Sequence, residues 1–572
     1  MSANRYLKNT AILFASMAVT KIIGALFKIP LANLLGGTGM GYFSTAYGLY
    51  SPIFAVTAAG VPTVIMRATA QNLALGRQER AAAIKRAALL LFTLIGMAGT
   101  AAVALLSAPF AQYVACSPQS RTAVLLISPA VMFCCTASVL RGYYEGMSDV
   151  VPSSAAAIAE AASRAVFGLS LSYAVIFYAR AAFQRGADVF GVSCTTAQQA
   201  YEAALPYAAA GAVAAVSISE FFGLITLVIA DRRHIRKSGV RPSSPEKGTC
   251  LKLLRDTAPI AASALVMNCV SFVDLLTVSR TISTSAAAHP EYFAERFGEA
   301  LKSCGSAEGL ANFMYGSYSG IAMSIFMLIP SFAGMAEKTS VPEIAAAWER
   351  RDYGTLSDRC FTLLRMSAII GAPACFGAAA LAEPILLMLY RTRAAEVSVC
   401  LDSFVALCFG GMFMITASAL FGIFQAAGKA HVPLALMTAS VALKLLLNPL
   451  LMYLPALNIS GAALASAAGY LLMSAGGAVY IKRKFPAKIR LASAVLPPAL
   501  CGAVCGLTAK ITFGLLVSVE NHVLRVAAAI AAGAFIYGIL LIVTGIFRTS
   551  GIIKRKIEKN FQKPLAKNQK IG

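Results

Sequence analysis

Charged side chains interrupt several long apolar runs of this 572-residue sequence, and any chemistry would begin with them. If the runs cross a membrane, an ionised side chain at the bilayer centre costs roughly 2.5–3.5 kcal/mol. Such a residue therefore lines a hydrated cleft, joins an internal ion pair or reaches the membrane interface. The cations in the runs are Lys21, Lys28, Arg67, Arg164, Arg280, Arg365 and Lys444, and the acids are Glu160, Glu220 and Asp274.

The spacing of Lys21 and Lys28 suggests an anion site. Seven residues correspond to two helical turns, so the two ammonium groups share a face about 10 Å apart along the axis. Gly24 lies between them on nearly the same face and leaves room for a ligand. A cationic cleft of this kind would hold a phosphate or diphosphate. For Lys28 and Arg280, a reach to the membrane interface explains the charge about as well.

Other charged residues have helical spacings that suggest pairs. Glu160 and Arg164 stand at i,i+4 and can neutralise each other, either as a structural pair or as a gate. The acids Glu220 and Asp274 are candidates for a coupling cation of unknown identity, although each is a lone acid. The candidates are therefore Lys21, Lys28, Arg67, Arg280, Lys444 and Asn448 for substrate, Arg141, Glu160 and Arg164 for a gate or ion pair, and Asp274 and Glu220 for a coupling ion.

The composition predicts an integral membrane protein. Hydrophobic residues make up 58% of the chain and charged residues only 13%, about half of the share found in soluble domains. This excludes a soluble enzyme, a disordered chain and a secreted disulfide scaffold. The 13 cysteines form no CxxC pair and there are four histidines, so we expect no metal site, cofactor or catalytic centre. The net charge of +24 lies in short clusters between apolar runs, which favours anionic lipid over nucleic acid as a partner.

Apolar runs of about 20 residues predict an all-α polytopic fold with 14 transmembrane helices. Between these spans, 33 Lys and Arg residues fall on one side and 8 on the other. The positive-inside rule then places both termini in the cytoplasm, with the basic tail 548–572 on anionic lipid. The predicted spans are 10–35, 43–70, 86–107, 121–141, 152–179, 203–230, 256–283, 310–335, 359–381, 398–424, 432–453, 460–481, 491–515 and 523–547.

An internal duplication divides the chain. Tyr-Gly-Leu-Tyr-Ser-Pro at 47–52 corresponds to Tyr-Gly-Ser-Tyr-Ser-Gly at 315–320, and each is followed by a proline fifteen residues after its first tyrosine, Pro62 and Pro330. Six spans in each half predict two parallel lobes related by a pseudo-two-fold axis along the membrane normal. The expected parts are an N-lobe 1–235, a basic linker 236–255, a C-lobe 256–484, a helix pair 485–547 and the tail 548–572. The outer segment 284–309 is a candidate amphipathic helix.

Several of these motifs resemble one family. Thr20-Lys21-Ile22-Ile23-Gly24, Phe27-Lys28-Ile29-Pro30 and Ala59-Gly60-Val61-Pro62 look like the first two helices of the stage V sporulation protein B group of polysaccharide transporters. Arg141-Gly142-Tyr143-Tyr144-Glu145-Gly146 with Glu160, and Lys444 with Asn448, resemble its later segments. This group is similar to the lipid II flippases and belongs to the multidrug/oligosaccharidyl-lipid/polysaccharide (MOP) exporter superfamily.

The resemblance implies a MATE-like fold of two six-helix lobes plus a terminal helix pair. It also implies a flippase that moves an undecaprenyl-diphosphate-linked glycan, such as lipid II, across the bacterial plasma membrane by alternating access. By position, Lys21, Lys28 and Arg67 match the cations that hold the diphosphate in the lipid II flippases. The rival functions are a multidrug or cation antiporter of the same fold and a non-transporting scaffold for cell-envelope synthesis enzymes.

Overall fold

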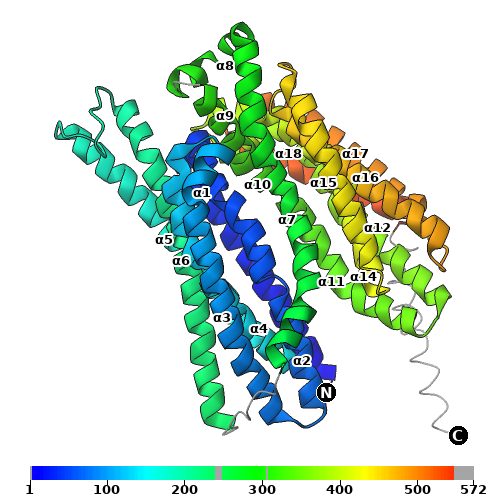
Figure 1. Cartoon of the computed structure of the whole chain (residues 1–572). Coiled ribbons are helices and arrows are strands. Elements are labelled where there is room, and N and C mark those ends of the chain that lie inside the picture. Colours follow the sequence, from blue (N-terminus) through cyan, green and yellow to red (C-terminus); the bar gives the residue numbers. More distant parts are fainter. Residues whose placement is uncertain (1–2, 239–247, 305–306, 547–572) are drawn as a thin grey trace, which may run out of the picture. The chain divides into compact units, whose positions relative to one another are not determined.

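The computed structural model describes residues 3–238, 248–304 and 307–546, and these are almost entirely helical (Figure 1). The chain divides into two compact units: unit 1 contains Met1–Ile321 and Asn448–Ile459, and unit 2 contains Ala322–Leu447 and Ser460–Gly572. The units differ from the predicted lobes, because the segment 249–321 packs within unit 1. The predicted basic tail 548–572 and residues 239–247 of the predicted linker lie outside the described residues.

Unit 1 is built from nine α-helices and three short π- or 3₁₀-helical turns within its described residues. The α-helices are α1 (Ala3–Thr57), α2 (Val61–Ala74), α3 (Gln78–Pro109), α4 (Arg121–Gly146), α5 (Val151–Gln184), α6 (Ala197–Ser238), α7 (Thr249–Ala288), α8 (Pro290–Cys304) and α9 (Ala307–Gly316). The turns are η1 (Phe110–Val114), η2 (Pro118–Ser120) and η3 (Ser317–Ala322), the last of which ends at the unit boundary.

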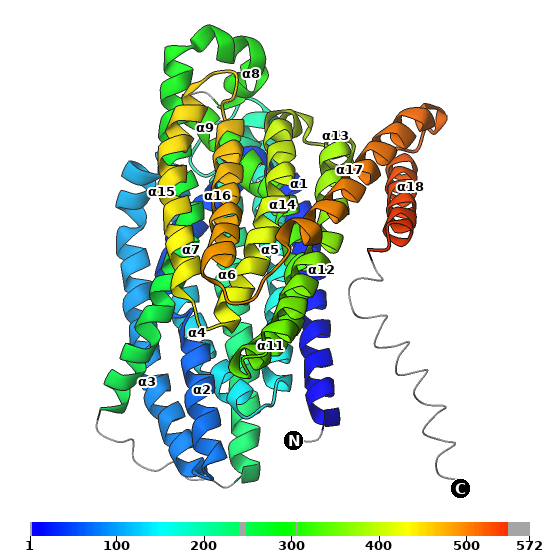
Figure 2. The ribbon, with the colours of Figure 1, turned by 90° about the vertical axis from the view of Figure 1, so that its right-hand side faces the viewer.

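Unit 2 contains the remaining helices, of which α15 crosses into unit 1 at its end. They are α10 (Met323–Phe326), α11 (Leu328–Glu349), α12 (Tyr353–Ala380), α13 (Ala382–Leu389), α14 (Ala394–Ala426), α15 (His431–Tyr453), α16 (Ser460–Lys484), α17 (Leu491–Leu515), η4 (Leu516–Ser518) and α18 (His522–Val543). Figure 2 shows α17 and α18 as an antiparallel pair that begins beside α12.

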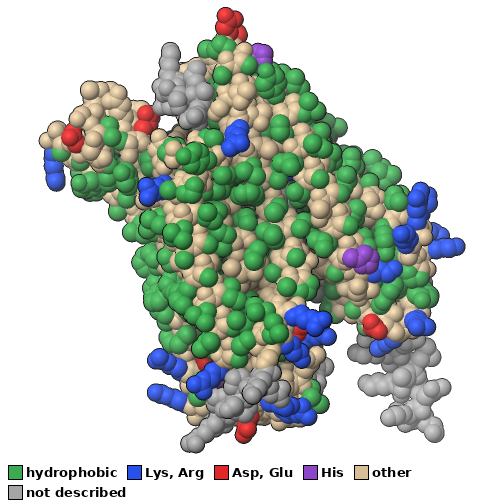
Figure 3. All heavy atoms as spheres, viewed as in Figure 1, with side chains coloured by type: hydrophobic (Ala, Val, Ile, Leu, Met, Phe, Trp, Pro, Cys, Tyr) green, Lys and Arg blue, Asp and Glu red, His purple; other side chains and the backbone are tan. Residues whose placement is uncertain are grey.

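The chain is a multi-pass membrane protein. Within the described ranges, twelve helical segments are long and apolar enough to cross a bilayer. The first, Ala15–Ala74, contains two predicted spans, and the predicted span 256–283 lies in α7 but is not among the twelve. The helical fold class is confirmed, whereas the count of fourteen crossings stays a prediction. In Figure 3, hydrophobic side chains cover the middle of unit 1 and Lys and Arg side chains gather at its lower end.

Proline explains a helix interruption that occurs at equivalent places in the two halves. Pro62 has no N–H to donate to the carbonyl of Ala58, and α1 ends at Thr57 before α2 begins at Val61. Pro330 likewise has no N–H to donate to the carbonyl of Phe326, the last residue of α10. The two breaks match under the offset of 268 residues that the sequence repeat predicts. This agreement in local structure supports the duplication.

Glycine permits the sharp turn between the first two predicted spans. Gly36 has φ 63° and ψ −170°, a backbone conformation that side chains rarely adopt, and it separates the two helical parts of α1. The helix is therefore kinked at Gly36. The predicted outer amphipathic helix is present as α8, in which Phe293 and Phe297 are buried and Glu291 and Glu295 are exposed.

The packing of α1, α4, α5 and α6 positions the charged residues of unit 1. In the contacts among these helices, α5 lies along α6, α4 packs against α6, and α1 packs against α5 (Figure 1). Small residues permit the close approach: a Cβ on Gly168 of α5 would press on the ring of Phe27 in α1. Hydrogen bonds add to this packing, since Ser16 on α1 donates to Ser154 on α5 at 3.2 Å.

An arginine on α12 connects the terminal helices α17 and α18 to the rest of unit 2. Arg365 on α12 is 6% exposed, and its Nη2 donates to the carbonyl oxygen of Ser493 at 3.0 Å, just inside α17. Its Nη1 lies 3.5 Å from the carbonyl oxygen of Ile546, beyond the end of α18. The guanidinium also stacks 4.5 Å from the centre of the Phe361 ring. Arg365 is therefore a structural cation that binds backbone carbonyls.

Candidate substrate-binding site

Two lysines on α1 begin the site. Lys21 and Lys28 lie on the part of α1 that precedes the Gly36 turn, and both side chains are exposed. Lys28 lies within electrostatic reach of Lys21 and of Arg164 on α5. A Cβ added to Gly24 would meet no atom within 4 Å, so the space between the lysines is open. This agrees with the small residue that the sequence places between the two lysines, and ligand binding there stays a prediction.

Lys21 and Lys28 lie on a different face of α1 from its exposed apolar side chains. Ile22 is 56% exposed and Leu26 is 63% exposed, as expected for side chains that contact lipid. At 3.6 residues per turn, these two positions lie roughly 130° around the helix from the mean direction of Lys21 and Lys28. The face that carries the lysines is directed toward Arg164, and the apolar face is separate from it.

Arg164 is held by α6. Its Nη2 donates to Glu220 Oε1 at 3.0 Å and its Nε donates to Ser219 Oγ at 3.2 Å. Glu220 is buried, with 9% of its side chain exposed, whereas 31% of the Arg164 side chain is exposed. Among the described residues Glu220 Oε2 has no hydrogen-bond partner. Glu220 is therefore anchored through one carboxylate oxygen, and the guanidinium that it orients remains accessible.

A second ion pair lies beside the first. Arg141 on α4 donates through Nη2 to Glu160 Oε1 on α5, and 24% and 11% of the two side chains are exposed. A Cβ on Gly223 of α6 would collide with the Glu160 carboxylate. The absence of a side chain at position 223 therefore makes room for this pair between three helices.

These pairings differ from the one that spacing indicated. Glu160 and Arg164 are one turn apart on α5, but Glu160 pairs with α4 and Arg164 pairs with α6. Helices that pack together can form ion pairs across their contacts, and tertiary partners that hold two buried charges outweigh an i,i+4 interaction of about 0.2–0.5 kcal/mol. The three residues Arg141, Glu160 and Arg164 are thus all in ion pairs, with partners that lie on neighbouring helices.

The cluster has an excess of positive charge. Lys21, Lys28, Arg141 and Arg164 contribute four positive charges, and Glu160 and Glu220 contribute two negative charges, which leaves a net charge of +2 for these six residues when all are ionised. One further acid, Glu145, lies outside this set but within electrostatic reach of Arg141. Tyr47 and Tyr50 of α1 also lie within electrostatic reach of Arg164, and their rings stand edge to face at 6.0 Å. We call these eight residues the unit 1 cluster. Its charge and its open gap suit an anionic group.

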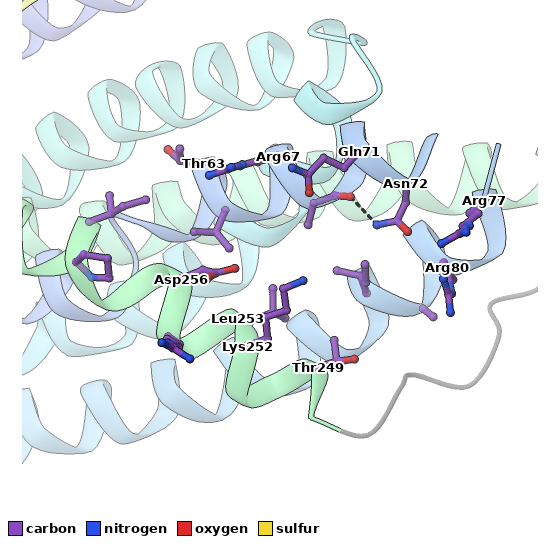
Figure 4. A pocket seen from close by; sticks show the side chains of 17 residues that line it. Thr63, Arg67, Gln71, Asn72, Arg77, Arg80, Thr249, Lys252, Leu253 and Asp256 are labelled. Carbon is purple, nitrogen blue, oxygen red and sulfur yellow. Dashed lines mark hydrogen bonds between the residues drawn. The ribbon is translucent and has the colours of Figure 1, made fainter. Parts of the chain in front are cut away.

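Arg67 lies in a different place. It is exposed on α2 and lines a cavity of about 840 Å³ with residues from α3 and α7 (Figure 4). Its neighbours there include Arg77, Arg80, Lys252 and Asp256, and none of the eight cluster residues lines this cavity. The structure therefore brings Lys21 and Lys28 together, with Arg164 as their neighbouring cation, and places Arg67 elsewhere in unit 1.

Asn448 and Asp274 meet within unit 1. The Asn448 side-chain amide donates to Asp274 Oδ1 at 3.0 Å and to Thr277 Oγ1 at 2.9 Å. Asn448 is 0% exposed and Asp274 is 4% exposed, so this is a buried polar junction between α7 and the end of α15. Lys444 is 2% exposed in unit 2.

Arg280 binds backbone at the far end of α7. Its Nη2 donates to the carbonyl oxygen of Tyr113 at 2.7 Å, in the turn that follows α3. This contact satisfies one of the carbonyls at a helix end. The structure thus gives Arg280 a capping contact, and its predicted role in substrate binding stays a prediction.

The sequence reasoning missed a buried pair between α3 and α6. Lys85 Nζ lies 2.7 Å from Asp231 Oδ1, and Tyr144 donates to the same oxygen at 3.2 Å. The ammonium also stands 4.6 Å from the centre of the Tyr143 ring. From the sequence, Lys85 is one of the basic residues in the loop that precedes the predicted span 86–107. The sequence offered one signal for this pair, the two adjacent tyrosines Tyr143 and Tyr144 of the motif 141–146, which contact Lys85 and Asp231 in the structure.

Comparison with known proteins agrees with the fold and motifs. Residues 6–197 match the family model described as polysaccharide biosynthesis protein. Stage V sporulation protein B of Bacillus subtilis (strain 168) is 24% identical over 555 residues, which cover 95% of this chain and 96% of that protein. The resemblance predicted from the sequence is confirmed. The lipid II flippase MurJ of the same organism is 21% identical over 565 residues, 95% of each chain.

Solved structures show the same fold. The lipid II flippase MurJ in an inward closed conformation superposes with a TM-score of 0.61 at 12% identity, covering 96% of this chain and 99% of that one. An inward-facing multidrug resistance MATE family transporter of the MOP superfamily gives 0.57 at 15% identity, covering 81% and 98%. The predicted MATE-like fold is therefore confirmed, although identities this low are informative about the fold alone.

Proposed function

We propose that this protein is a flippase that moves a polyprenyl-diphosphate-linked glycan of the bacterial cell envelope from the cytoplasmic to the outer leaflet. The observation that carries the proposal is the net charge of +2 at the unit 1 cluster, where Lys21, Lys28 and Arg164 adjoin an open gap. A diphosphate carries compensating charge, and cations are its usual protein ligands. The similarity to stage V sporulation protein B and to MurJ supports this class of cargo.

In this proposal the arginine and the lysines of the cluster hold the diphosphate in different ways. Arg164 is oriented by Glu220 and Ser219, so its guanidinium loses little freedom when an anion binds. The two lysines are flexible point charges that can follow the headgroup as it moves. Both termini lie in the cytoplasm, and an inside-negative potential favours outward movement of an anion by about 2.3 kcal/mol per charge per 100 mV. Alternating access between the two halves completes the cycle.

The structure favours this function over export of cationic drugs. A site for cations would present unpaired carboxylates, whereas both acids of the unit 1 cluster are in ion pairs with arginine. The proteins of known structure with this fold include multidrug transporters, so the fold does not distinguish the two functions. The charge of the cluster supports an anionic cargo.

The test is complementation of a lipid II flippase depletion strain by the Lys21→Ala/Lys28→Ala protein. Loss of growth at normal protein abundance is expected, since the net charge of the cluster falls from +2 to zero. The matched control is Lys510→Ala, which removes an exposed lysine from α17 in unit 2 and should leave growth unchanged. Growth equal to wild type in the double variant would refute the assignment of the cluster and would favour a scaffold that transports nothing.

Native mass spectrometry of the purified protein gives a direct readout of the cargo. A co-purified polyprenyl diphosphate in the wild type, reduced in the Lys21→Ala/Lys28→Ala protein, is the expected result. Retention of bound cationic amphiphiles instead would favour the antiporter.

A further inference from the structure

A strained turn lies between α5 and α6, at the end of unit 1 that the predicted topology places outside. Val189 and Val192 exchange two backbone hydrogen bonds of 3.0 Å each, which closes a two-residue hairpin. Its central residues, Phe190 and Gly191, have φ of 52° and 82°. A two-residue turn with positive φ at both central positions favours Asn, Asp or Gly at the first of them. Phenylalanine occupies that position at a cost in backbone strain, so the contacts of its ring call for an explanation.

The Phe190 ring joins an exposed group of aromatic side chains. It stacks on Tyr207 of α6 with ring centres 4.2 Å apart, and it lies 5.6 Å from the ring of Tyr178 on α5. Tyr178 and Tyr207 are 59% and 41% exposed. On α5 the exposed rings of Tyr173 and Phe177 stack at 6.3 Å. We call these five residues the α5–α6 aromatic patch: Tyr173, Phe177, Tyr178, Phe190 and Tyr207.

One exposed face of α5 changes its chemistry along the helix. At 3.6 residues per turn, Val166, Tyr173, Phe177 and Arg180 lie within about 60° of one another. All four are exposed, so toward the turn this face presents an aliphatic, then two aromatic and then a cationic side chain. Membrane helices show the same order where they leave the hydrocarbon, pass the headgroups and reach water. Because α5 is long and apolar enough to cross a bilayer, this order indicates a membrane interface at the patch.

The packing beneath the turn holds the patch in place. Val189 is 0% exposed and belongs to a buried cluster with small side chains of both helices, among them Ala179 and Ala200. Phe190 packs partly against the same cluster. The turn is therefore fixed to α5 and α6, and its aromatic ring is held beside Tyr178 and Tyr207.

The polar side chains near the turn bond to one another. Ser193 Oγ donates to Asp188 Oδ1 at 2.8 Å, and Gln198 Nε2 donates to Glu202 Oε1 at 2.7 Å. A site for a sugar or a peptide needs polar groups that converge beside the rings to fix the orientation of the ligand. A bilayer interface requires only apolar rings on one side and tyrosine hydroxyls on the other. Figure 3 shows hydrophobic side chains along the lower edge of this projecting end of unit 1, on the side of its hydrophobic middle.

We propose that the α5–α6 aromatic patch is a lipid-binding surface that lies at the level of the phospholipid headgroups. In the predicted topology these headgroups belong to the outer leaflet. Tyr178 and Tyr207 place their rings against the lipid and their hydroxyls toward water, and Arg180 reaches the lipid phosphates. The strained turn holds Phe190 in the same layer. The patch fixes the depth of α5 and α6 in the bilayer, and this role does not depend on the cargo of the protein.

Tryptophan fluorescence of the full-length protein tests the depth of the turn. The chain has one tryptophan, Trp348, and Trp348→Phe provides a background for a single reporter. Phe190→Trp is introduced into this background, and the protein is reconstituted in nanodiscs of phosphatidylcholine with bromine on the acyl chains near the headgroup. Bromine quenches tryptophan on contact, so we expect the emission to fall roughly twofold or more relative to unbrominated phosphatidylcholine.

The matched control is Gln198→Trp in the same background. Gln198 is exposed on α6, nine residues before Tyr207, which places it about 14 Å along the axis and on the opposite face. Brominated lipid should leave its emission nearly unchanged, whereas acrylamide in the buffer should quench it strongly. Emission at position 190 that ignores brominated lipid and is quenched by acrylamide as strongly as at position 198 would overturn the proposal. That result would place the patch in water, as the surface for a soluble partner.

A second reporter covers the case in which a tryptophan at position 190 prevents folding. Phe177→Trp replaces one exposed ring of the patch by another on regular helix, where the backbone carries no strain. Size-exclusion chromatography confirms that each variant is folded and monodisperse. Brominated lipid should quench this reporter at least as strongly as the one at position 190, and quenching no greater than at position 198 would contradict the lipid contact of the patch.

Discussion

Removal of Glu160 tests the energetics of the unit 1 cluster most directly. Glu160→Leu deletes the carboxylate that neutralises Arg141, and Arg141 has only 24% of its side chain exposed. Breaking a buried pair by removal of one partner costs about 3–5 kcal/mol, and the partial hydration of Arg141 reduces this to roughly 2–3 kcal/mol. The free energy of unfolding should fall by that amount.

The double variant Arg141→Met/Glu160→Leu separates charge from shape. Replacing a whole buried pair by apolar residues is often neutral or stabilising, so the double variant should lie within about 1 kcal/mol of wild type. The control Glu202→Gln changes a partly exposed acid on α6 and keeps its hydrogen-bond acceptor for Gln198, so it should cost less than about 0.5 kcal/mol. Equilibrium unfolding of the purified proteins in mixed micelles, followed by circular dichroism, measures all four.

Two outcomes would refute this reasoning. A Glu160→Leu protein as stable as wild type would mean that Arg141 is fully hydrated without its partner. A double variant as unstable as the single would mean that the loss comes from packing or from a further partner, and not from an uncompensated charge.

Three further changes follow from the geometry. Gly223→Ala should cost about 1–3 kcal/mol by forcing the Glu160 carboxylate aside, whereas Gly377→Ala, where a Cβ would meet nothing within 4 Å, should be neutral or stabilising in the same unfolding assay. Arg365→Gln should destabilise the protein by about 2–3 kcal/mol through its lost carbonyl contacts. Arg359→Gln, which breaks a partly exposed ion pair with Glu343, should cost under about 1 kcal/mol, and equal effects of the two changes would contradict the role of Arg365 in holding the terminal helix pair. Asn448→Leu leaves Asp274 Oδ1 and Thr277 without the amide donor, so a loss of about 1–3 kcal/mol is expected, and unchanged stability would show that the junction is dispensable.

The sequence predicted the helices well because hydropathy acts within one segment. Each of the fourteen predicted spans is largely helical over its described residues, and Pro62 and Pro330 interrupt their helices where a missing N–H requires it. The ion-pair partners of the charged residues could not be predicted from the sequence. Spacing considers one helix at a time, so it paired Glu160 with Arg164, whereas the packing of α4 and α5 against α6 decides the pairs. Only the tertiary structure brings Arg77 and Lys252, counted as loop cations, beside Arg67.

The charge of the unit 1 cluster bears on how the proposed flippase would release its cargo. A carrier must bind its cargo strongly enough to load and weakly enough to release. Two of the four cations of the cluster are already in ion pairs with glutamate, so they would attract a bound anion less than four uncompensated cations would. For a diphosphate of charge about −3, an inside-negative potential of 100 mV would contribute about 7 kcal/mol toward the outside, at about 2.3 kcal/mol per charge. In the proposed mechanism, outward release therefore needs no nucleotide hydrolysis.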